Sequence, residues 1–276
     1  MGAIIPAPAA PPPAGSMRWY AWLFAAPVAR AVLAAAFALE VELRSIVASR
    51  VDHGVAHLKL QWWREEFLRL EQGQPRHPLT QAARSAAPDA SSAWRPMQDL
   101  LSSLELDLAC ATYESEDELD RYLALADGMQ RAMAAVHRPD DTRLERFASA
   151  VGQAARSVEI ICDLHQDAMD GRIYLPLTWL DAEGIDHHEL RAENTSPGVR
   201  RCLARLAARS REQSQQAREA LIESDFAALR GQIVFLQLHQ ALLDQIEREQ
   251  FDVGRRHITL SSMQSLWTAW RAARQH

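Results

Sequence analysis

Apolar residues recur along most of the chain at the three- and four-residue spacing that places them on one face of a helix. Ala31, Ala34, Leu39, Leu43 and Ile46 follow this spacing. The same pattern predicts helices within residues 55–70 and over residues 119–136, 143–169, 199–224 and 226–251. No segment alternates apolar and polar residues with the β-branched enrichment of a strand. The chain is therefore predicted to be all-α.

The breaks between the predicted helices are short. They fall at residues 73–78, 85–96, 138–141, 170–176 and 193–198, and none is long or polar enough to link two domains. Residues 17–276 are therefore expected to form one domain. Residues 1–16 carry five of the thirteen prolines and no charge. This composition predicts a disordered Pro/Ala-rich tail that cannot build a core.

Charge and cysteine content exclude several classes of protein. The chain has 30 basic and 36 acidic residues and a net charge of −6, whereas nucleic-acid-binding proteins usually carry a basic excess. No nucleic-acid partner is therefore expected. The three cysteines, Cys110, Cys162 and Cys202, have no CxxC spacing, which excludes a zinc ribbon and a disulfide framework.

The alanine-rich segment 19–39 is long enough to raise the question of a membrane span. Pro27 and Arg30 lie near its middle, and a central arginine is unfavourable in a bilayer. A buried helix that begins after Pro27 is expected instead. Residues 1–16 lack the basic and apolar regions of a signal peptide, so a cytoplasmic location is predicted.

Three acidic residues are spaced to share one face of the predicted helix over residues 143–169. Glu159, Asp163 and Asp167 are each separated by one helical turn. Like charges in this arrangement repel, and a hard divalent cation such as Mg²⁺ would relieve the repulsion because it prefers carboxylate oxygens. The alternative is a solvated acidic stripe without a ligand. The spacing alone leaves both interpretations open.

The segment around these residues resembles the second aspartate-rich region of squalene and phytoene synthases. The matching residues are Gly152, Ala154, Ile160, Asp163, Asp167, Gly171, Arg172, Tyr174, Leu175 and Pro176. Four other segments resemble motifs of this family in the same order along the chain. They are Pro27, Arg30, Ala34 and Phe37; Gln61–Arg64 with His77 and Pro78; Asp107, Tyr122 and Gly128; and Gln250–Arg256 with Leu260. The resemblance covers about residues 24–270.

This resemblance implies an isoprenoid-synthase-type helical bundle around a central apolar cavity. Family enzymes join two prenyl diphosphates head to head, and Mg²⁺ ions held by carboxylates of two facing helices assist the loss of diphosphate. No organic cofactor is implied. The implied substrate-binding residues are Arg30, Arg172, Tyr174 and Arg256, and the implied metal ligands are Asp163, Asp167 and Glu159. For Arg255 and Arg256, solvation of a turn is the equally weighted alternative.

The first aspartate-rich motif of the family is missing. The matching stretch runs from Glu42 to Ile46, and only Glu42 keeps a carboxylate. A lone carboxylate is a poor Mg²⁺ ligand set, so Glu42 is expected to be a remnant of the motif and the metal to be weakly held. Leu43 and Ile46 are interpreted as extending the apolar face of the helix into the core. Arg44 brings positive charge between them, where it would contact a diphosphate.

The second motif is altered as well. Arg156, Glu159, Cys162 and Gln166 replace the family's glutamine, asparagine, arginine and glutamate. Arg156 is expected to pair with Glu159 at a spacing of three residues. Cys162 is expected to pack in the core, because neighbouring acids disfavour a reactive thiolate. These departures limit the transfer of catalytic roles.

Two functions remain open at this stage. The first is a family member that binds a prenyl diphosphate or a similar lipid through Asp163 and Asp167, with condensation impaired or lost. The second is a non-catalytic assembly or scaffolding factor with a protein partner, resembling the branch of the family that assembles respiratory complex I. Apolar substrates would place the protein peripherally at the inner face of a membrane. Trp62 and Trp63 cannot share one helix face, so one of them is expected to reach an interface or lipid.

Overall fold

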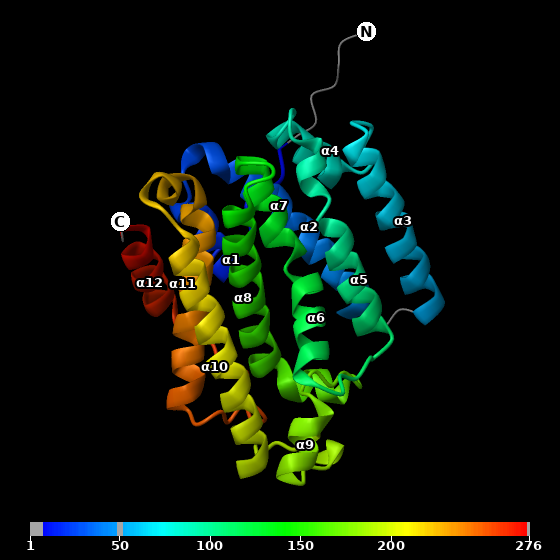
Figure 1. Ribbon diagram of the computed structural model, residues 1–276, viewed down its shortest axis with the longest axis vertical. Coiled ribbons are helices and arrows are strands. Elements are labelled where there is room, and N and C mark those ends of the chain that lie inside the picture. Colours follow the sequence, from blue (N-terminus) through cyan, green and yellow to red (C-terminus); the bar gives the residue numbers. More distant parts are fainter. Residues whose placement is uncertain (1–7, 49–51, 275–276) are drawn as a thin grey trace.

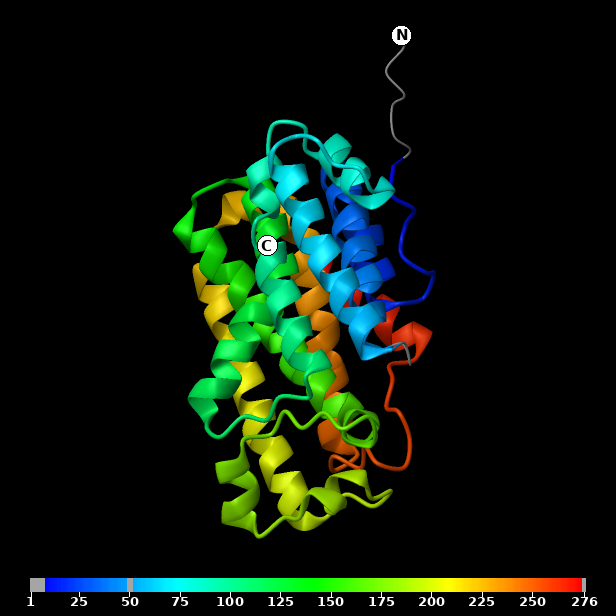
Figure 2. The same cartoon turned by 90° about the vertical axis from the view of Figure 1, so that its right-hand side faces the viewer.

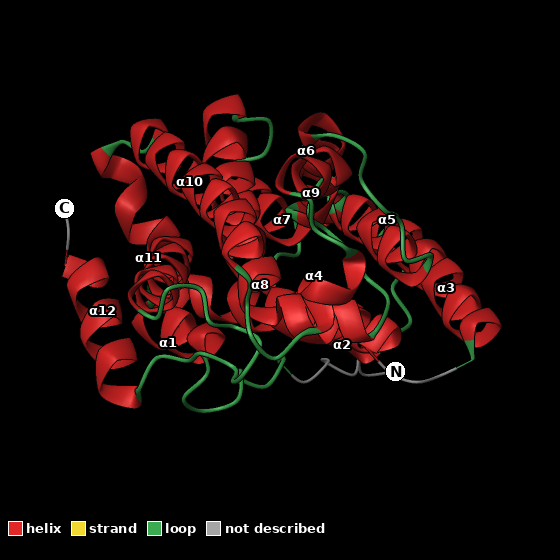
Figure 3. Cartoon of the chain, turned by 90° about the horizontal axis from the view of Figure 1, so that it is seen from below, coloured by secondary structure: helices red, strands yellow, loops and turns green. Residues whose placement is uncertain are grey.

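The computed structural model describes residues 8–48 and 52–274. These residues form twelve α-helices and no strand (Figures 1 and 3), which confirms the all-α prediction. The helices are α1 Met17–Phe24, α2 Arg30–Ala48, α3 His53–Glu71, α4 Pro78–Ala86, α5 Met97–Leu108, α6 Glu116–Ala126, α7 Gly128–His137, α8 Thr142–Met169, α9 Leu177–Glu183, α10 Pro197–Ala220, α11 Phe226–Arg248 and α12 Ser262–Arg274. Short 3₁₀ helices occupy Pro27–Ala29, Ser91–Trp94, His187–Arg191 and Glu223–Asp225.

Helix α8 is the central element of the bundle. It is 28 residues long and packs against α6, α7, α10 and α11. Figure 1 shows α8 running along the long axis, with α3 and α5 on one side and α11 and α12 on the other. Helix α9 lies at the far end of the molecule from α4. Helix α8 therefore contributes side chains to the core along the length of the bundle.

Most predicted helices agree with the structure to within a few residues. The predictions over 143–169, 199–224 and 226–251 correspond to α8, α10 and α11, which begin and end near these bounds. The single helix predicted over 119–136 is wrong, because the chain turns at Asp127 between α6 and α7. A Cβ atom on Gly128 would lie 2.1 Å from the backbone oxygen of Pro96. The turn therefore brings α7 into direct backbone contact with the residues before α5.

The N-terminal part of the chain lies against the bundle where it is described. Residues 1–7 of the predicted disordered tail are outside the described residues. Residues 8–13 form no helix, but Pro12 is buried and Ala9 packs against the core. The segment 19–39 is divided between α1 and α2, with Pro27 opening the 3₁₀ helix between them. Among the residues that the structure covers, no helix is both long and apolar enough to cross a membrane.

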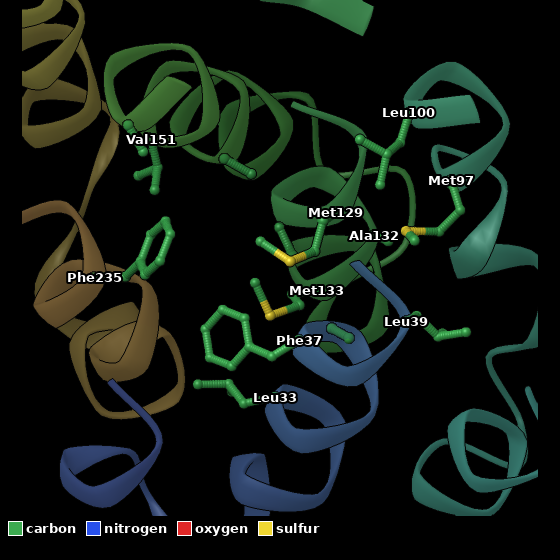
Figure 4. Close-up of a cluster of buried hydrophobic side chains, with 14 of the residues drawn as sticks. Leu33, Phe37, Leu39, Met97, Leu100, Met129, Ala132, Met133, Val151 and Phe235 are labelled. Carbon is green, nitrogen blue, oxygen red and sulfur yellow. The ribbon is translucent and has the colours of Figure 1, made fainter. Parts of the chain in front are cut away.

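Apolar side chains from α2, α7 and α11 fill the interior. Figure 4 shows Leu33, Phe37, Met129, Met133 and Phe235 turned toward one another. The rings of Phe37 and Phe235 lie 5.6 Å apart, centre to centre. This packing occupies the middle of the bundle at the level of Phe37.

An apolar pocket of about 440 Å³, open to solvent on one side, lies at one end of this cluster. Its walls come from the start of α2, residues 86–90, the end of α7 and the start of α11. Val32, Leu33 and Met133 line it together with Leu229. Asp163 and Asp167 lie near the opposite end of α8. The pocket therefore lies at the end of the bundle away from the acidic residues, and it differs in position from the central cavity that the resemblance implies.

Candidate functional site

The stretch of α2 that corresponds to the missing motif turns its apolar residues inward. Leu43 and Ile46 are buried in the core, while Glu42 is exposed. Glu40, two residues before the matched stretch, is the buried carboxylate of this helix. The helix therefore presents Glu40 and Arg44 to the interior, one turn apart, and directs Glu42 to solvent.

A network of ion pairs lies between α2 and α8. Arg18 of α1 donates two hydrogen bonds to Oε2 of Glu40, at 3.0 and 2.8 Å. Arg44 donates to Oε1 of the same carboxylate at 3.0 Å. Both guanidinium groups also lie 3.9 Å from the carboxylate of Glu159 on α8. Two arginines therefore stand between the carboxylates of the two helices.

Arg156 extends this network along α8. It donates to Oε2 of Glu159 at 3.2 Å and to the hydroxyl of Tyr122 at 2.7 Å, so the predicted pair between Arg156 and Glu159 is confirmed. Its guanidinium also lies 5.0 Å from the ring centre of Tyr174. The hydroxyl of Tyr174 donates to Asp107 at 2.7 Å. Tyr174 thus faces the predicted site, but its hydroxyl already has a protein partner.

Burial and the neighbouring arginines have opposite effects on the pKa values of the carboxylates in this network. Burial alone would raise the pKa of Glu159, but Arg44, a hydrogen bond with His239, Arg156 and Arg18 hold that pKa well below its usual range. Burial would likewise raise the pKa of Glu40, whereas Arg18 and Arg44 lower it. Both carboxylates therefore stay ionised, with their charge neutralised by arginines of the chain itself.

Asp163 and Asp167 of the second motif lie on one face of α8, as their spacing predicts. Burial, with the charges of Glu159 and Asp167, raises the pKa of Asp163 to about 6. Asp167 accepts two hydrogen bonds from Arg172, at 3.0 and 2.9 Å. Arg172 also donates to Asp170 at 3.0 Å. Arg172 thus lies next to the predicted metal ligands and pairs with one of them.

The other predicted substrate-binding arginines lie apart from this face. Arg30 donates to the backbone oxygen of Leu23 at 2.8 Å and stacks on Trp22 at 5.4 Å. Arg256 is exposed and pairs with Glu249. The structure therefore does not bring the side chains of Arg30 and Glu42 to Asp163, and the side chain of Arg256 pairs with Glu249 although the next residue, His257, contacts Asp163.

Several residues of the network were not singled out from the sequence. Glu40 was missed, although it forms an i, i+4 pair with Arg44, and this local signal could have identified it. Arg18 and His239 come from α1 and α11, and Nε2 of His239 lies 3.8 Å from Oε1 of Glu159. No local pattern connects residues this far apart in the chain.

The described side chains do not fit a magnesium site shared by two helices. Such a site needs carboxylates with free oxygen atoms on both sides. Here Glu42 points to solvent, Glu40 and Glu159 are paired with arginines, and Asp167 is paired with Arg172. Of the acidic residues considered, Asp163 alone stays next to the network without an arginine partner among the described ion pairs.

The chain is similar to phytoene synthases in sequence. A family model described as squalene/phytoene synthase matches residues 13–264. The phytoene synthase of Arthrospira platensis is 28% identical over 215 residues, which are 70% of this chain and 67% of that protein. The phytoene synthase of Thermus thermophilus is 29% identical over 151 residues, 54% of this chain and 52% of that protein. Phytoene synthase 3 of Zea mays is 25% identical, and the match covers 48% of its length. The chain thus spans about half the length of the latter two proteins.

Solved structures show the same fold. A dehydrosqualene synthase in complex with ligand superposes with a TM-score of 0.79 at 15% identity, over 93% of this chain and 90% of that chain. The squalene synthase HpnC from Alicyclobacillus acidocaldarius superposes with a TM-score of 0.71 at 23% identity, over 84% and 88% of the two chains. These likenesses confirm the predicted isoprenoid-synthase-type helical bundle.

Proposed function

The chain belongs to the squalene/phytoene synthase family, and from this premise we propose that it binds a prenyl diphosphate or a similar lipid without condensing two of them. The observation that carries the proposal is the position of Arg44. It lies between the carboxylates of Glu40 and Glu159, where the family chemistry needs metal ions between two helices. Glu42, the remnant of the first motif, faces solvent.

A positive charge fixed at this position opposes metal binding in two ways. It repels a divalent cation, and it occupies the carboxylate oxygens that would serve as ligands. Without paired metal ions, the negative charge that develops on a leaving diphosphate lacks its main stabilisation. We therefore expect condensation to be lost. Binding of Mg²⁺ by Glu159, Asp163 and Asp167 remains a prediction, and the arginine pairs of Glu159 and Asp167 make it weak.

The cavity at the end of the bundle supports retention of an apolar ligand. Its volume of about 440 Å³ lies within the range of small-molecule sites. Val32, Leu33, Met133 and Leu229 give it an apolar wall. A linear prenyl or acyl chain could fill this space without contact with the charged network. The ligand class proposed is therefore a lipid with an extended hydrocarbon chain.

The test combines turnover and binding. The purified protein is incubated with labelled farnesyl or geranylgeranyl diphosphate and Mg²⁺, and released diphosphate and C30 or C40 hydrocarbon are measured. We expect no product and a ligand-induced rise in the melting temperature. Hydrocarbon that forms with the native protein and disappears in Asp163→Asn would contradict the proposal.

A matched pair of variants on α2 locates the binding site. Val32→Trp fills the cavity and is expected to abolish the ligand-induced thermal shift. Val41→Trp adds the same side chain at a position that is 51% exposed, and it should leave the shift unchanged. Unfolding curves without ligand check that both variants fold. Equal shifts in the two variants would place the ligand elsewhere.

A non-catalytic assembly or scaffolding factor is the second candidate, and the outer face of α3 favours it. Leu58 is 66% exposed and Trp62 41% exposed, one turn apart, while Trp63 is buried. Exposed apolar residues in such an arrangement are typical of a protein-binding surface. If the protein is such a factor, Trp62→Ser would abolish its assembly or scaffolding activity in cells and leave the ligand-induced thermal shift intact. Under the lipid-binding function, Val32→Trp would abolish both.

A further inference from the structure

Three metal-binding side chains meet between α8 and the segment that joins α11 to α12. They are Cys162 and Asp163 of α8 and His257 of the connecting segment. Nδ1 of His257 lies 3.7 Å from Sγ of Cys162 and 3.4 Å from Oδ1 of Asp163. Cys162 is buried, whereas 62% of the His257 side chain and 43% of the Asp163 side chain are exposed. The cluster therefore opens to solvent on one side only.

These distances suit a tetrahedral zinc ion. With Zn–S of about 2.3 Å and Zn–N and Zn–O of about 2.0 Å, tetrahedral geometry separates sulfur from nitrogen by about 3.6 Å and nitrogen from oxygen by about 3.3 Å. Both separations are close to those observed. A thiol, an imidazole and a carboxylate together favour a borderline-soft ion over Mg²⁺, which prefers oxygen ligands alone. The donor set therefore differs in kind from a magnesium site.

We propose that Cys162, Asp163 and His257 bind Zn²⁺, with the fourth coordination position open to solvent. Binding releases the thiol proton of Cys162 to solvent and uses the neutral imidazole of His257. Cys162 already holds the connecting segment through a hydrogen bond to the backbone oxygen of Ile258, at 3.4 Å. On metal binding, the Zn–S bond would replace this hydrogen bond as the tie between α8 and the connecting segment, whose backbone runs along the outside of the bundle in Figure 2, in orange-red. This site goes beyond lipid binding and does not depend on it.

Cobalt absorption tests the site, because a thiolate ligand gives Co²⁺ a near-ultraviolet charge-transfer band. The native protein is expected to develop this band with one equivalent of Co²⁺ and to lose it on addition of Zn²⁺, but not with an excess of Mg²⁺. Cys162→Ser should abolish the band. His257→Ala, at an exposed position, should weaken Co²⁺ binding at least about tenfold. Cys110→Ser, which removes an exposed thiol elsewhere, should change nothing.

Two results would overturn the site. One is the absence of the band at saturating Co²⁺. The other is a band that survives Cys162→Ser and is lost in Cys110→Ser. No prenyl compound is present in this titration, so its failure leaves the lipid-binding proposal untouched.

A second, independent observation concerns the outer face of α12. Met263 is 83% exposed, Leu266 49% and Trp267 57%. Trp270 lies one turn further and stacks on Trp267, with ring centres 5.1 Å apart. The opposite face packs against α1 and α11 through Ser265, Ala269 and Ala272. The helix is thus anchored on one side and presents an aromatic and apolar stripe on the other.

The charge of α12 differs from that of the whole chain. The helix has no acidic residue, and its last turn carries Arg271 and Arg274. The guanidinium of Arg274 lies 4.2 Å from the ring centre of Trp270. Arg271 also lines a cavity of about 250 Å³ together with Arg211 and Arg218. A cationic aromatic helix on a chain of net charge −6 is a local feature suited to an anionic surface.

We infer that α12 binds the interface of an anionic lipid bilayer. Tryptophan side chains favour the headgroup region, and arginines beside them pair with lipid phosphates. Leu266 and Trp267 would enter the acyl boundary while α12 stays packed on α11. This contact would hold the protein peripherally on a membrane, which is the location expected for a protein with apolar ligands.

Vesicle binding tests this surface. The native protein should co-sediment with phosphatidylcholine vesicles that contain phosphatidylglycerol, and less with phosphatidylcholine alone. Trp267→Ser should lower the partition coefficient at least about fivefold, because binding scales with buried apolar area. Ile222→Ser removes an apolar side chain that is 49% exposed between α10 and α11, and it should leave the partition coefficient unchanged. Equal loss in both variants, or no binding by the native protein, would refute the inference. A dimer that Trp267→Ser dissociates would identify a second copy as the occupant instead.

Discussion

Arg44 and Glu40 face each other across one turn of α2, with Nε of the arginine 3.0 Å from Oε1 of the carboxylate. This pair sets the charge of the bundle interior between α2 and α8. It fixes a positive charge next to Glu159 of α8, so the two helices are joined by the chain's own cations. The arginines thereby neutralise the carboxylates of Glu40 and Glu159 without a metal.

Glu40 and Glu42 should respond very differently to the same substitution. Glu40→Gln removes the nearest carboxylate of Arg18 and Arg44, which are partly buried and keep Glu159 at 3.9 Å, so a loss of about 1–3 kcal/mol is expected. Glu42→Gln changes an exposed residue and should alter the free energy of unfolding by less than about 0.5 kcal/mol. Urea unfolding of both variants measures the difference. Similar losses would show that Glu42 belongs to the network.

Arg156 and Glu159 should be energetically coupled. Each has additional partners, so each single change to glutamine leaves the other residue partly compensated. A double-mutant cycle with Arg156→Gln and Glu159→Gln is expected to give a coupling of about 0.5–3 kcal/mol. The free energies of unfolding of the four proteins provide this value. Additivity within about 0.3 kcal/mol would mean that the 3.2 Å contact contributes little.

The helices and the acidic face of α8 could be predicted because their signals are local. Apolar spacing within one helix gave α8 nearly to the residue, and the i, i+4 spacing of Asp163 and Asp167 placed both on one face. The turn at Asp127 was missed although Asp127–Gly128 is a local turn signal. The close approach of Gly128 to the backbone of Pro96 could not be predicted, because it depends on tertiary packing. Within the ion-pair network, the local pair of Arg156 and Glu159 was predicted, but the contacts of Arg18 with Glu40 and of His239 with Glu159 could not be, because tertiary packing brings these residues together.

Gly128 should be intolerant of a side chain. A Cβ atom there would lie 2.1 Å from the Pro96 oxygen, which is backbone and cannot rotate away. Gly128→Ala is therefore expected to cost about 1–3 kcal/mol through overpacking. Gly54→Ala is the control, because its nearest neighbour is the end of the Asp52 side chain. That variant should change the free energy of unfolding by less than about 1 kcal/mol, because the helix propensity of alanine offsets a small shift of the Asp52 carboxylate that caps α3. Thermal unfolding of the two variants compares them directly, and equal melting temperatures would contradict the close contact.

Glu66 should make part of the stability depend on pH. Burial alone would raise its pKa, but the backbone N–H of His77, the hydroxyl of Thr80, Arg69 and the N–H of Arg76 lower that pKa below the usual value. A carboxyl whose pKa is lowered on folding contributes stability above its unfolded pKa of about 4.3, and the contribution is lost as the pH falls through the folded value.

Glu66→Gln is therefore expected to destabilise the protein by about 1–3 kcal/mol at pH 7, because a charged acceptor is replaced at several hydrogen bonds. The difference between the variant and the native protein should shrink below about pH 4, where Glu66 itself becomes protonated. Urea unfolding of both proteins between pH 3 and pH 7 measures this convergence. Glu65→Gln, which changes an exposed neighbour, is the control and should follow the native protein at every pH. A constant difference across the range would show that the loss at Glu66 arises from packing and not from charge.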